Sequence, residues 1–271
     1  MLRKILSFIV VCMLYIVPVH AELKVDIVAG ATSPISIAVL KFETTDGVKS
    51  KDAAMIRDVV EADLKRTGLF HIVSHDALPE YVKMGDMPNF KLWQAIKTQV
   101  LVQAKLSSVS DNSYKLEFFV WDVDAGEQIE AQSLVSSRKS ARRLAHIMAD
   151  AIYERLTGEI GYFDTQIVFI AETGPVGNRA KRMAIIDQDG YGLRYLSDGD
   201  SFVMSPHFSP NMGTIVFLSY YNDDPSVWTL DLETGEQRKL GQFGGMNFAP
   251  RFSPDGKKIA LSLVKKGFTH I

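Results

Sequence analysis

The chain has 271 residues, of which 46% are hydrophobic and 23% are charged, and its formal net charge is −2. That balance gives no electrostatic reason to expect binding to nucleic acid, which selects strongly basic surfaces. The single cysteine, Cys12, allows no internal disulfide, but a chain of this length buries enough surface to be stabilised by its core alone.

The first 21 residues have the pattern of an export signal. Arg3 and Lys4 form a short basic start, residues 5–19 are apolar, and small residues, the second of them Ala21, occupy the positions that a signal peptidase reads. The apolar run is short for a membrane span of about 20 residues. We therefore predict cleavage after Ala21, a mature N-terminus at Glu22 and no stable membrane insertion. Loss of the two basic residues leaves 28 basic and 32 acidic residues, a net charge of −4.

Residues 34–160 alternate helix and strand patterns, and we predict an α/β domain there. The apolar, β-branched run at 34–42 indicates a buried strand. Ser50 is placed to cap a helix that Gly68 ends, and a second long helix ends at Gly158. The apolar stripe of this second helix is Leu144, Ile147, Met148, Ala151, Ile152 and Leu156. The remaining elements expected are strands at 70–73, 100–106, 114–123 and 127–135 and a short helix at 90–96.

Short strand patterns separated by turn residues replace the helical spacing over 161–271. Pro206-His207-Phe208-Ser209-Pro210 recurs 44 residues later as Pro250-Arg251-Phe252-Ser253-Pro254. A period of about 40–45 residues built from short strands is typical of a β-propeller blade. We therefore predict an all-β, incomplete β-propeller of about two blades, in which the repeated phenylalanine packs between sheets. The turn at Asp255-Gly256 is expected to be tighter than its counterpart at Asn211-Met212-Gly213.

No pattern in the chain indicates catalysis, and we predict no catalytic, cofactor or metal site. Neither a Gly-x-Ser-x-Gly elbow nor a His-Glu-x-x-His pair occurs. His71 and His75 lie on a predicted strand and loop, which would not bring them to one face. His146 and Asp150 share a helix face, and we interpret them as a surface pair. A basic cluster that opens the same helix is interpreted as a solvated face, with an acidic partner surface as the alternative. The cluster is Arg138, Lys139, Arg142 and Arg143.

The order of elements and the junction between them resemble the TolB family. His146-x3-Asp150 leads into Glu154-Arg155-Leu156-Thr157-Gly158, and Gly161-x-Phe163-x-Thr165-x-Ile167 follows, as in family members. Asp187-x-Asp189-Gly190-Tyr191 is similar to a turn of the family's first blade. The resemblance implies a periplasmic protein of the Tol-Pal system that is not an enzyme, has no cofactor, and supports outer-membrane integrity and cell division.

The resemblance also implies two protein partners. In the family, the extreme mature N-terminus binds the inner-membrane-anchored protein TolA, which places that function in the segment 22–33 of this chain. The residues concerned are Glu22, Leu23, Lys24, Val25, Asp26, Ile27 and Val28. Their alternation of apolar and charged residues suits a strand added to a partner's sheet edge, although an ordinary edge strand has the same pattern.

The second implied partner is the peptidoglycan-associated lipoprotein Pal, which binds one face of the family propeller. The positions that this resemblance assigns to inter-blade loops facing Pal are Ser205, Pro206, His207, Met246, Asn247, Ala249 and Pro250. Many relatives have histidine where Met246 stands and glycine where Phe248 stands, so the chain departs from the family pattern there.

The family propeller has six blades, and this chain has the pattern of about two. The resemblance therefore implies a fragment or split product, or blades supplied by another chain, with partly exposed faces around Phe208, Phe252 and Leu261. Two other classes remain open. One is part of a propeller-bearing hydrolase, whose nucleophile elbow would lie downstream. The other is a periplasmic ligand-binding protein, for which a deep polar pocket in the α/β domain is expected.

Overall fold

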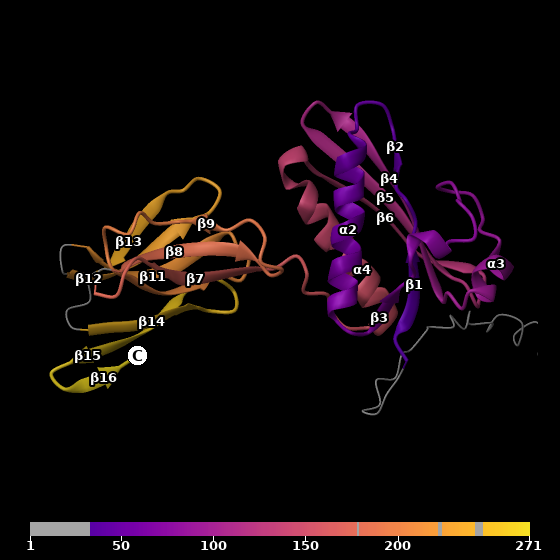
Figure 1. The fold of residues 1–271 in the computed structure, drawn as a ribbon. Coiled ribbons are helices and arrows are strands. Elements are labelled where there is room, and N and C mark those ends of the chain that lie inside the picture. The colour runs from indigo at the N-terminus through magenta and orange to yellow at the C-terminus, as the bar shows by residue number, and fades with distance from the viewer. Residues whose placement is uncertain (1–32, 178, 222–223, 242–245) are drawn as a thin grey trace, which may run out of the picture. The chain divides into compact units, whose positions relative to one another are not determined.

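The computed structural model describes residues 33–177, 179–221, 224–241 and 246–271. The chain divides after Gly161 into two compact units, which we call the α/β unit and the strand unit (Figure 1). Within the described ranges, no helix is long and apolar enough to cross a membrane.

The α/β unit contains one mixed sheet with the strand order β3-β1-β4-β5-β6, and β2 pairs with β4. The strands are β1 (Ile35–Val39), β2 (Glu43–Thr44), β3 (Phe70–Ile72), β4 (Val100–Ser110), β5 (Ser113–Asp122) and β6 (Glu127–Ser137). Strand β1 runs parallel to β3 and β4, whereas β4, β5 and β6 pair antiparallel. The predicted α/β class is confirmed.

Two helices, α2 (Ser50–Arg66) and α4 (Ala141–Thr157), pack against each other on one face of this sheet (Figure 1). The α4 face turned to the core is Leu144, Ala145, Met148, Ala149, Ile152 and Leu156, all buried. Ile147 and Ala151, which we placed in the stripe, are only half-buried. The difference follows from helix geometry. The buried residues are spaced four apart along one side of the helix, and Ile147 and Ala151 lie at the edge of that side.

Both helices end where the sequence predicts, but α2 begins differently. Gly68 and Gly158 follow the two helices with φ of 75° each, the left-handed conformation that glycine adopts most readily. The prediction that Ser50 caps α2 is wrong, because the cap position is Lys49 and no side chain makes a capping hydrogen bond. Asp52 in the first turn supplies the negative charge that favours this helix end instead.

The opposite face of the sheet is covered by the segment between β3 and β4, which holds η1 (His75–Ala77) and α3 (Phe90–Ala95). Trp93 is fully buried in the cluster formed there. Gln103 fixes the segment to the sheet: its Nε2 donates to two carbonyl oxygens of the segment at 3.1 Å each, and its Oε1 accepts from Trp121 at 3.0 Å. A buried amide satisfied in this way stabilises the arrangement instead of costing desolvation energy.

The α/β unit ends on a glycine that its packing requires. A Cβ atom added at Gly161 would come within 2.6 Å of the Cα atom of Asp150 on α4, closer than real Cβ contacts allow. This close approach explains why the junction needs a glycine at position 161, opposite Asp150.

The described part of the strand unit folds into three antiparallel sheets. Sheet 1 is β7 (Gln166–Thr173), β8 (Ala180–Asp187) and β9 (Arg194–Tyr195). Sheet 2 is β10 (Val203–Phe208), β11 (Thr214–Tyr221), β12 (Asp224–Asp231) and β13 (Gln237–Gly241). Sheet 3 is β14 (Met246–Phe252), β15 (Ile259–Lys265) and β16 (Phe268–His270). These sheets do not close into a ring, and an incomplete propeller fits them, as predicted.

The core of the strand unit lies between the sheets. One apolar cluster joins sheets 1 and 2 and includes Phe208, and a second joins sheets 2 and 3 and includes Phe252 and Leu261. The repeated phenylalanine thus packs between sheets, as predicted. The three side chains stand at sheet junctions and are only half-buried there, so they stay partly exposed, as predicted.

The two Ser-Pro turns have the same hydrogen bonds. The equivalent residues are Ser209 and Ser253, Asn211 and Asp255, Met212 and Gly256, and Thr214 and Lys258. In both turns the serine N–H donates to the carbonyl five residues on, at 2.7 and 2.8 Å, and the serine hydroxyl donates to the side-chain oxygen two residues on, at 2.6 and 2.5 Å. The expectation of a looser first turn is therefore wrong. Asn211 offers the same acceptor as Asp255, and Met212 adopts a φ of 56° where Gly256 has 70°.

Candidate interaction surfaces

Strands β10 and β14 carry the same irregularity at the same point of the repeat. In β10 the register shifts at Ser205 and Pro206, which together stand opposite a single residue of β11. In β14 it shifts in the same way at Ala249 and Pro250, opposite a single residue of β15. Two residues opposite one define a β-bulge, which bends a strand and frees backbone groups from the ladder.

Proline explains why the bulge forms at this position. Pro206 and Pro250 have no N–H to donate, so a regular ladder at either position would lack a hydrogen bond. The residue before each proline takes a left-handed conformation, with φ of 52° at Ser205 and 47° at Ala249. A non-glycine residue in this region costs about 1–3 kcal/mol, and such strain concentrates at functional sites.

All seven residues assigned to the Pal contact lie in these two strands and not in loops, so their predicted placement in inter-blade loops is wrong. Three of them belong to β10 and four to β14, and the two strands pack against each other. His207 and Ala249 are exposed beside the bulges, Ser205 and Pro206 are half-buried, and Pro250 is buried. Proline within a strand resembles a loop signal in the sequence, because the bulge that accommodates it depends on the partner strand.

The predicted TolA segment, from Glu22 to Val28, lies outside the described residues. The same holds for the predicted signal sequence and its cleavage point after Ala21. These assignments stay predictions.

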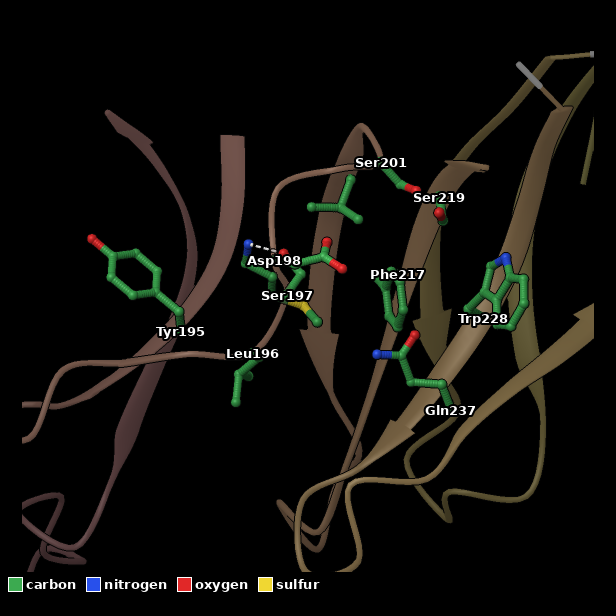
Figure 2. Close-up of a pocket in the computed structure, with 11 residues that line it drawn as sticks. Tyr195, Leu196, Ser197, Asp198, Ser201, Phe217, Ser219, Trp228 and Gln237 are labelled. Carbon is green, nitrogen blue, oxygen red and sulfur yellow. Dashed lines mark hydrogen bonds between the residues drawn. The ribbon is translucent and has the colours of Figure 1, made fainter. Parts of the chain in front are cut away.

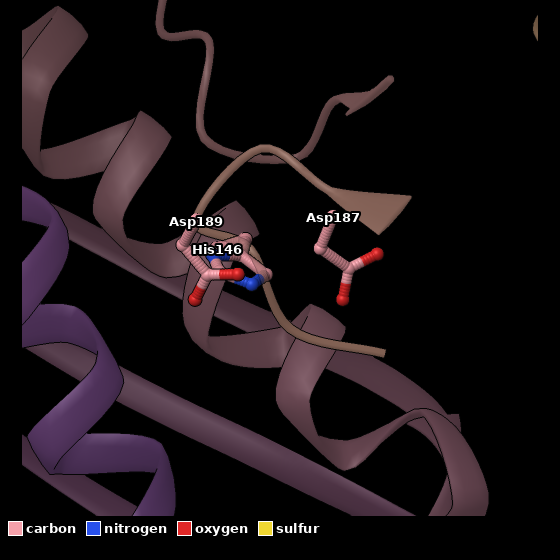
Figure 3. A group of neighbouring side chains, drawn as sticks. All are labelled: His146, Asp187 and Asp189. Carbon is pink, nitrogen blue, oxygen red and sulfur yellow. The ribbon is translucent and has the colours of Figure 1, made fainter. Parts of the chain in front are cut away.

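A buried charged group in the α/β unit was missed by sequence reasoning. Asp63 on α2 is completely buried, and its Oδ2 shares a 2.6 Å hydrogen bond with Nδ1 of His146 on α4. Its Oδ1 accepts from Arg66 one turn further along α2. His146, whose side chain Figure 3 shows on its helix, is only 3% exposed, so the interpretation of a surface pair with Asp150 is wrong.

A signal for this group does exist in the sequence. Asp63 falls three residues after Val60 and seven after Ile56, which places it on the buried face of α2. A carboxylate on such a face requires a partner, because an unpaired buried charge is strongly unfavourable. The spacing alone could not name His146, which lies 83 residues away.

The basic cluster at the start of α4 is not simply a solvated face. Arg138 precedes the helix in a 3-10 turn, η2 (Arg138–Ser140), and its Nη2 donates to the Gly47 carbonyl at 3.2 Å and the Ser108 hydroxyl at 2.8 Å. Its guanidinium also lies 4.7 Å from the centre of the Tyr114 ring. For Arg138 the solvated interpretation is wrong, since the side chain ties three segments together.

The two histidines that we weighed as a metal pair do not converge. His71 is exposed on β3, whereas Nε2 of His75 lies 3.2 Å from a carboxylate oxygen of Glu61 on α2. Burial raises the pKa of the Glu61 carboxyl, and the nearby His75 and Arg57 partly oppose that shift. The contact joins the segment after β3 to α2 and does not bring the two histidines together.

Asp187 at the end of β8 and Asp189 in the turn after it, both drawn in Figure 3, accept hydrogen bonds from neighbouring groups. Asp187 accepts a 2.8 Å hydrogen bond from the Gln166 amide, and Asp189 accepts one of 3.0 Å from the Tyr191 N–H. The Asp189 acceptor stabilises the turn that resembles one in the family's first blade, and Asp187 ties the same turn to β7.

A cavity of about 510 Å³ lies between sheets 1 and 2 (Figure 2). Its apolar floor includes Met183, Val203 and Phe217, and its polar lining includes Asp198 and Gln237. The Met183 N–H donates to the Ser197 hydroxyl across its wall at 2.9 Å. The ligand-binding alternative expects a deep polar pocket in the α/β domain, whereas this cavity belongs to the strand unit.

An α/β unit joined to stacked, repeating β-sheets defines a propeller-bearing protein of two units. Residues 23–129 match the TolB amino-terminal domain, and residues 153–271 match the TolB beta propeller domain. The chain therefore belongs to the TolB family.

A solved structure agrees with this membership. The structure of TolB from Acinetobacter baumannii is similar with a TM-score of 0.73 and 25% identity, covering 88% of this chain and 57% of that chain. The chain thus spans little more than half the length of that relative. Putative TolB from Agrobacterium tumefaciens matches at 12% identity over 57% of this chain and 54% of that one, but its TM-score of 0.34 is too low to carry an argument.

Proposed function

We propose that this protein is a non-enzymatic, periplasmic component of the Tol-Pal system that supports outer-membrane integrity and cell division. It binds TolA through residues 22–28 and Pal through the strand unit. Membership of the TolB family supports this function. The observation that supports the Pal contact is the pair of matched bulges in β10 and β14.

The bulges suit protein recognition for a physical reason. Each one interrupts the ladder and frees backbone groups from strand pairing, and at the second bulge the Pro250 carbonyl accepts from the Arg251 side chain at 2.8 Å. Because β10 and β14 are packed neighbours, the two sets of groups stand close together on one unit. Exposed His207 and Arg251, which occupy equivalent places after the two prolines, add polar side chains that a partner can contact.

The Pal contact is tested by titrating the full chain with the purified periplasmic part of Pal in a calorimeter. A central interface residue costs about 1–3 kcal/mol when truncated, so His207→Ala and Arg251→Ala should each weaken binding roughly tenfold or more. Lys257→Ala, in the exposed turn between β14 and β15, is the matched control and should bind normally. Unchanged affinity in both bulge variants would overturn the assignment.

The TolA contact is tested separately with the mature chain shortened by residues 22–28. This variant should lose TolA in a pull-down experiment while keeping Pal binding and the same thermal transition. Retained TolA binding would show that another surface is used. The two experiments are independent, because one removes an N-terminal segment and the other alters strands more than 170 residues away.

A further inference from the structure

The cavity between sheets 1 and 2 has the size of a small-molecule site. Its volume of about 510 Å³ falls within the roughly 300–1,000 Å³ that ligand pockets occupy. The two sheets and the segment that joins them build its walls, so every described lining residue belongs to the strand unit. None of these residues is assigned to the TolA or the Pal contact. The cavity is therefore a candidate site in addition to those two contacts.

One donor in the cavity wall lacks a partner. The Nε1 atom of Trp228 on β12 is buried, and no group within the described residues accepts a hydrogen bond from it. The other two tryptophans are satisfied, because Trp93 donates to Glu80 at 2.8 Å and Trp121 donates to Gln103 at 3.0 Å. A buried indole N–H usually has an acceptor, since leaving it unpaired costs desolvation energy. An acceptor on a bound molecule would satisfy the Trp228 donor.

Further polar side chains line the same cavity and come from both sheets and from the segment between them (Figure 2). Asp198, which follows β9, accepts from the Asp200 N–H through Oδ1 at 3.0 Å, which leaves Oδ2 as an acceptor for a ligand. The Gln237 amide on β13 offers both a donor and an acceptor, and so does the Ser201 hydroxyl. A ligand that fits this lining both donates and accepts hydrogen bonds.

The charges at the cavity favour a neutral ligand. Asp198 is the only charged residue among the described residues that line it. A positive charge lies close to the same wall, because the guanidinium carbon of Arg182 is 3.9 Å from the centre of the Tyr195 ring. An anion would meet the charge of Asp198 and a cation would meet that of Arg182, and like charges placed together are unfavourable. A neutral molecule avoids both costs.

We propose that the cavity binds a neutral sugar that carries an acetamido group. The acetamido carbonyl accepts from Trp228 Nε1, and its methyl group packs on the apolar floor, where Met183 and Phe217 are buried. The sugar hydroxyls donate to Asp198 and exchange hydrogen bonds with Gln237. The C–H groups of the sugar ring pack on the apolar faces of the aromatic side chains.

The indole N–H resonances of the full chain test the proposal, because each of the three tryptophans gives one signal. Trp228→Phe identifies the signal of Trp228 by its loss. Titration with N,N′-diacetylchitobiose, a neutral disaccharide with two acetamido groups, should shift that signal until it saturates. The signals of Trp93 and Trp121, which have acceptors of their own in the α/β unit, are internal controls and should not move.

A matched ligand and a matched pair of variants sharpen the test. Cellobiose has the same linkage with hydroxyl groups in place of the acetamido groups. It should bind roughly tenfold or more weakly, because the buried N–H then lacks its carbonyl acceptor. Asp198→Asn should weaken N,N′-diacetylchitobiose binding about tenfold by removing the charged acceptor. Asp200→Asn, in the same segment but outside the lining, is the control and should bind like the unaltered chain.

A saturable shift confined to Trp228, weaker binding of cellobiose and weaker binding in Asp198→Asn together support the site. No shift of the Trp228 signal, a common shift of all three signals, equal binding of cellobiose, or unchanged affinity in Asp198→Asn overturns it. Far-UV circular dichroism checks that each variant is folded. If Asp198→Asn is not, Gln237→Ala on the exposed side of the same cavity replaces it.

Discussion

The two units of this protein bury their apolar side chains in different ways. In the α/β unit a single sheet is covered on one face by α2 and α4 and on the other by the segment that holds α3. In the strand unit each core lies between sheets of the same repeat, and each sheet depends on a neighbour. The first unit buries its sheet against its own helices and connecting segment, whereas the second buries apolar side chains between one sheet and the next.

The contrast extends to polar groups. The α/β unit buries the carboxylate of Asp63 and satisfies it from two directions, by His146 and Arg66. In the strand unit the repeated polar contacts lie in turns, exposed at Ser253 and Asp255 and partly buried at Ser209 and Asn211. Substitutions should therefore have large effects in the α/β unit and smaller, graded effects in the turns.

The largest effect is expected from Ile152→Asp in α4. Ile152 is fully buried on the core face of the helix, and burying an unpaired charge is among the few changes that cost more than about 4 kcal/mol. The α/β unit should be largely unfolded by circular dichroism at 25 °C. Glu154→Gln, at an exposed position of the same helix, should melt like the unaltered chain. A folded Ile152→Asp would show that this face of α4 does not form the core.

The next effect concerns the buried pair between α2 and α4. Asp63→Ala removes the acceptor shared by His146 and Arg66, and breaking a buried pair costs about 3–5 kcal/mol. Urea unfolding should show that loss. Asp58→Ala removes an exposed ion pair with Arg57 on the same helix and should cost at most about 1 kcal/mol. Equal losses in the two variants would contradict the structural importance of Asp63.

A smaller effect is expected in the paired turns of the strand unit. Gly256→Ala should destabilise the unit by about 1 kcal/mol, because alanine is unfavourable at positive φ. The added Cβ would meet Pro210 at 3.5 Å, an ordinary contact, so the cost is conformational. Met212→Gly should instead stabilise the unit, because glycine adopts the same positive φ in the first turn without that cost. If chemical unfolding shows that both substitutions change the free energy of unfolding in the same direction, the two turns are not equivalent.

The smallest effect is on acid stability. Hydrogen bonds from the Ser253 hydroxyl and the Lys257 N–H hold the pKa of Asp255 below its usual range. Because the folded pKa is lowered, the stability gained from Asp255 is present above the unfolded value of about 3.9 and is lost as the pH falls through the folded pKa. Asp255→Asn keeps the acceptor oxygen and should remove this dependence. The Lys257 amide resonance, followed from pH 5 to pH 2, should then stay constant, and a persistent titration would exclude Asp255 as its source.

Much of the fold could be predicted from the sequence because it depends on the spacing of residues that are close together in the chain. The helical periodicity of residues around Ile152, the stops at Gly68 and Gly158 and the 44-residue repeat all correspond to elements of the structure. Where prediction failed, distant partners decide the outcome. Pro206 beside Ser205 is incompatible with a regular ladder, but nothing near it in the chain reveals that β11 is the partner strand, and nothing near Asp63 reveals His146.

The number of sheets was also difficult to predict from the sequence. The Phe-Ser-Pro repeat indicates sheets 2 and 3, whereas sheet 1 lacks that pentapeptide and is recognised by its pairing and by Met183 in the junction core. Which faces are covered could not be predicted either, since Phe208 and Ile167 are both apolar strand residues. Only the stacking order shows that the first lies at a junction and the second does not.

Hydrogen–deuterium exchange of the full chain tests most directly whether the two units bury their apolar side chains in these different ways. Amides of β4 and β5, in the sheet that is covered on both faces, should exchange slowest. In the strand unit, β11 packs on sheet 1 through one face and on sheet 3 through the other, so its amides should exchange more slowly than those of β7 and β15. Exchange in β7 and β15 that is as slow as in β5 and β11 would contradict the account.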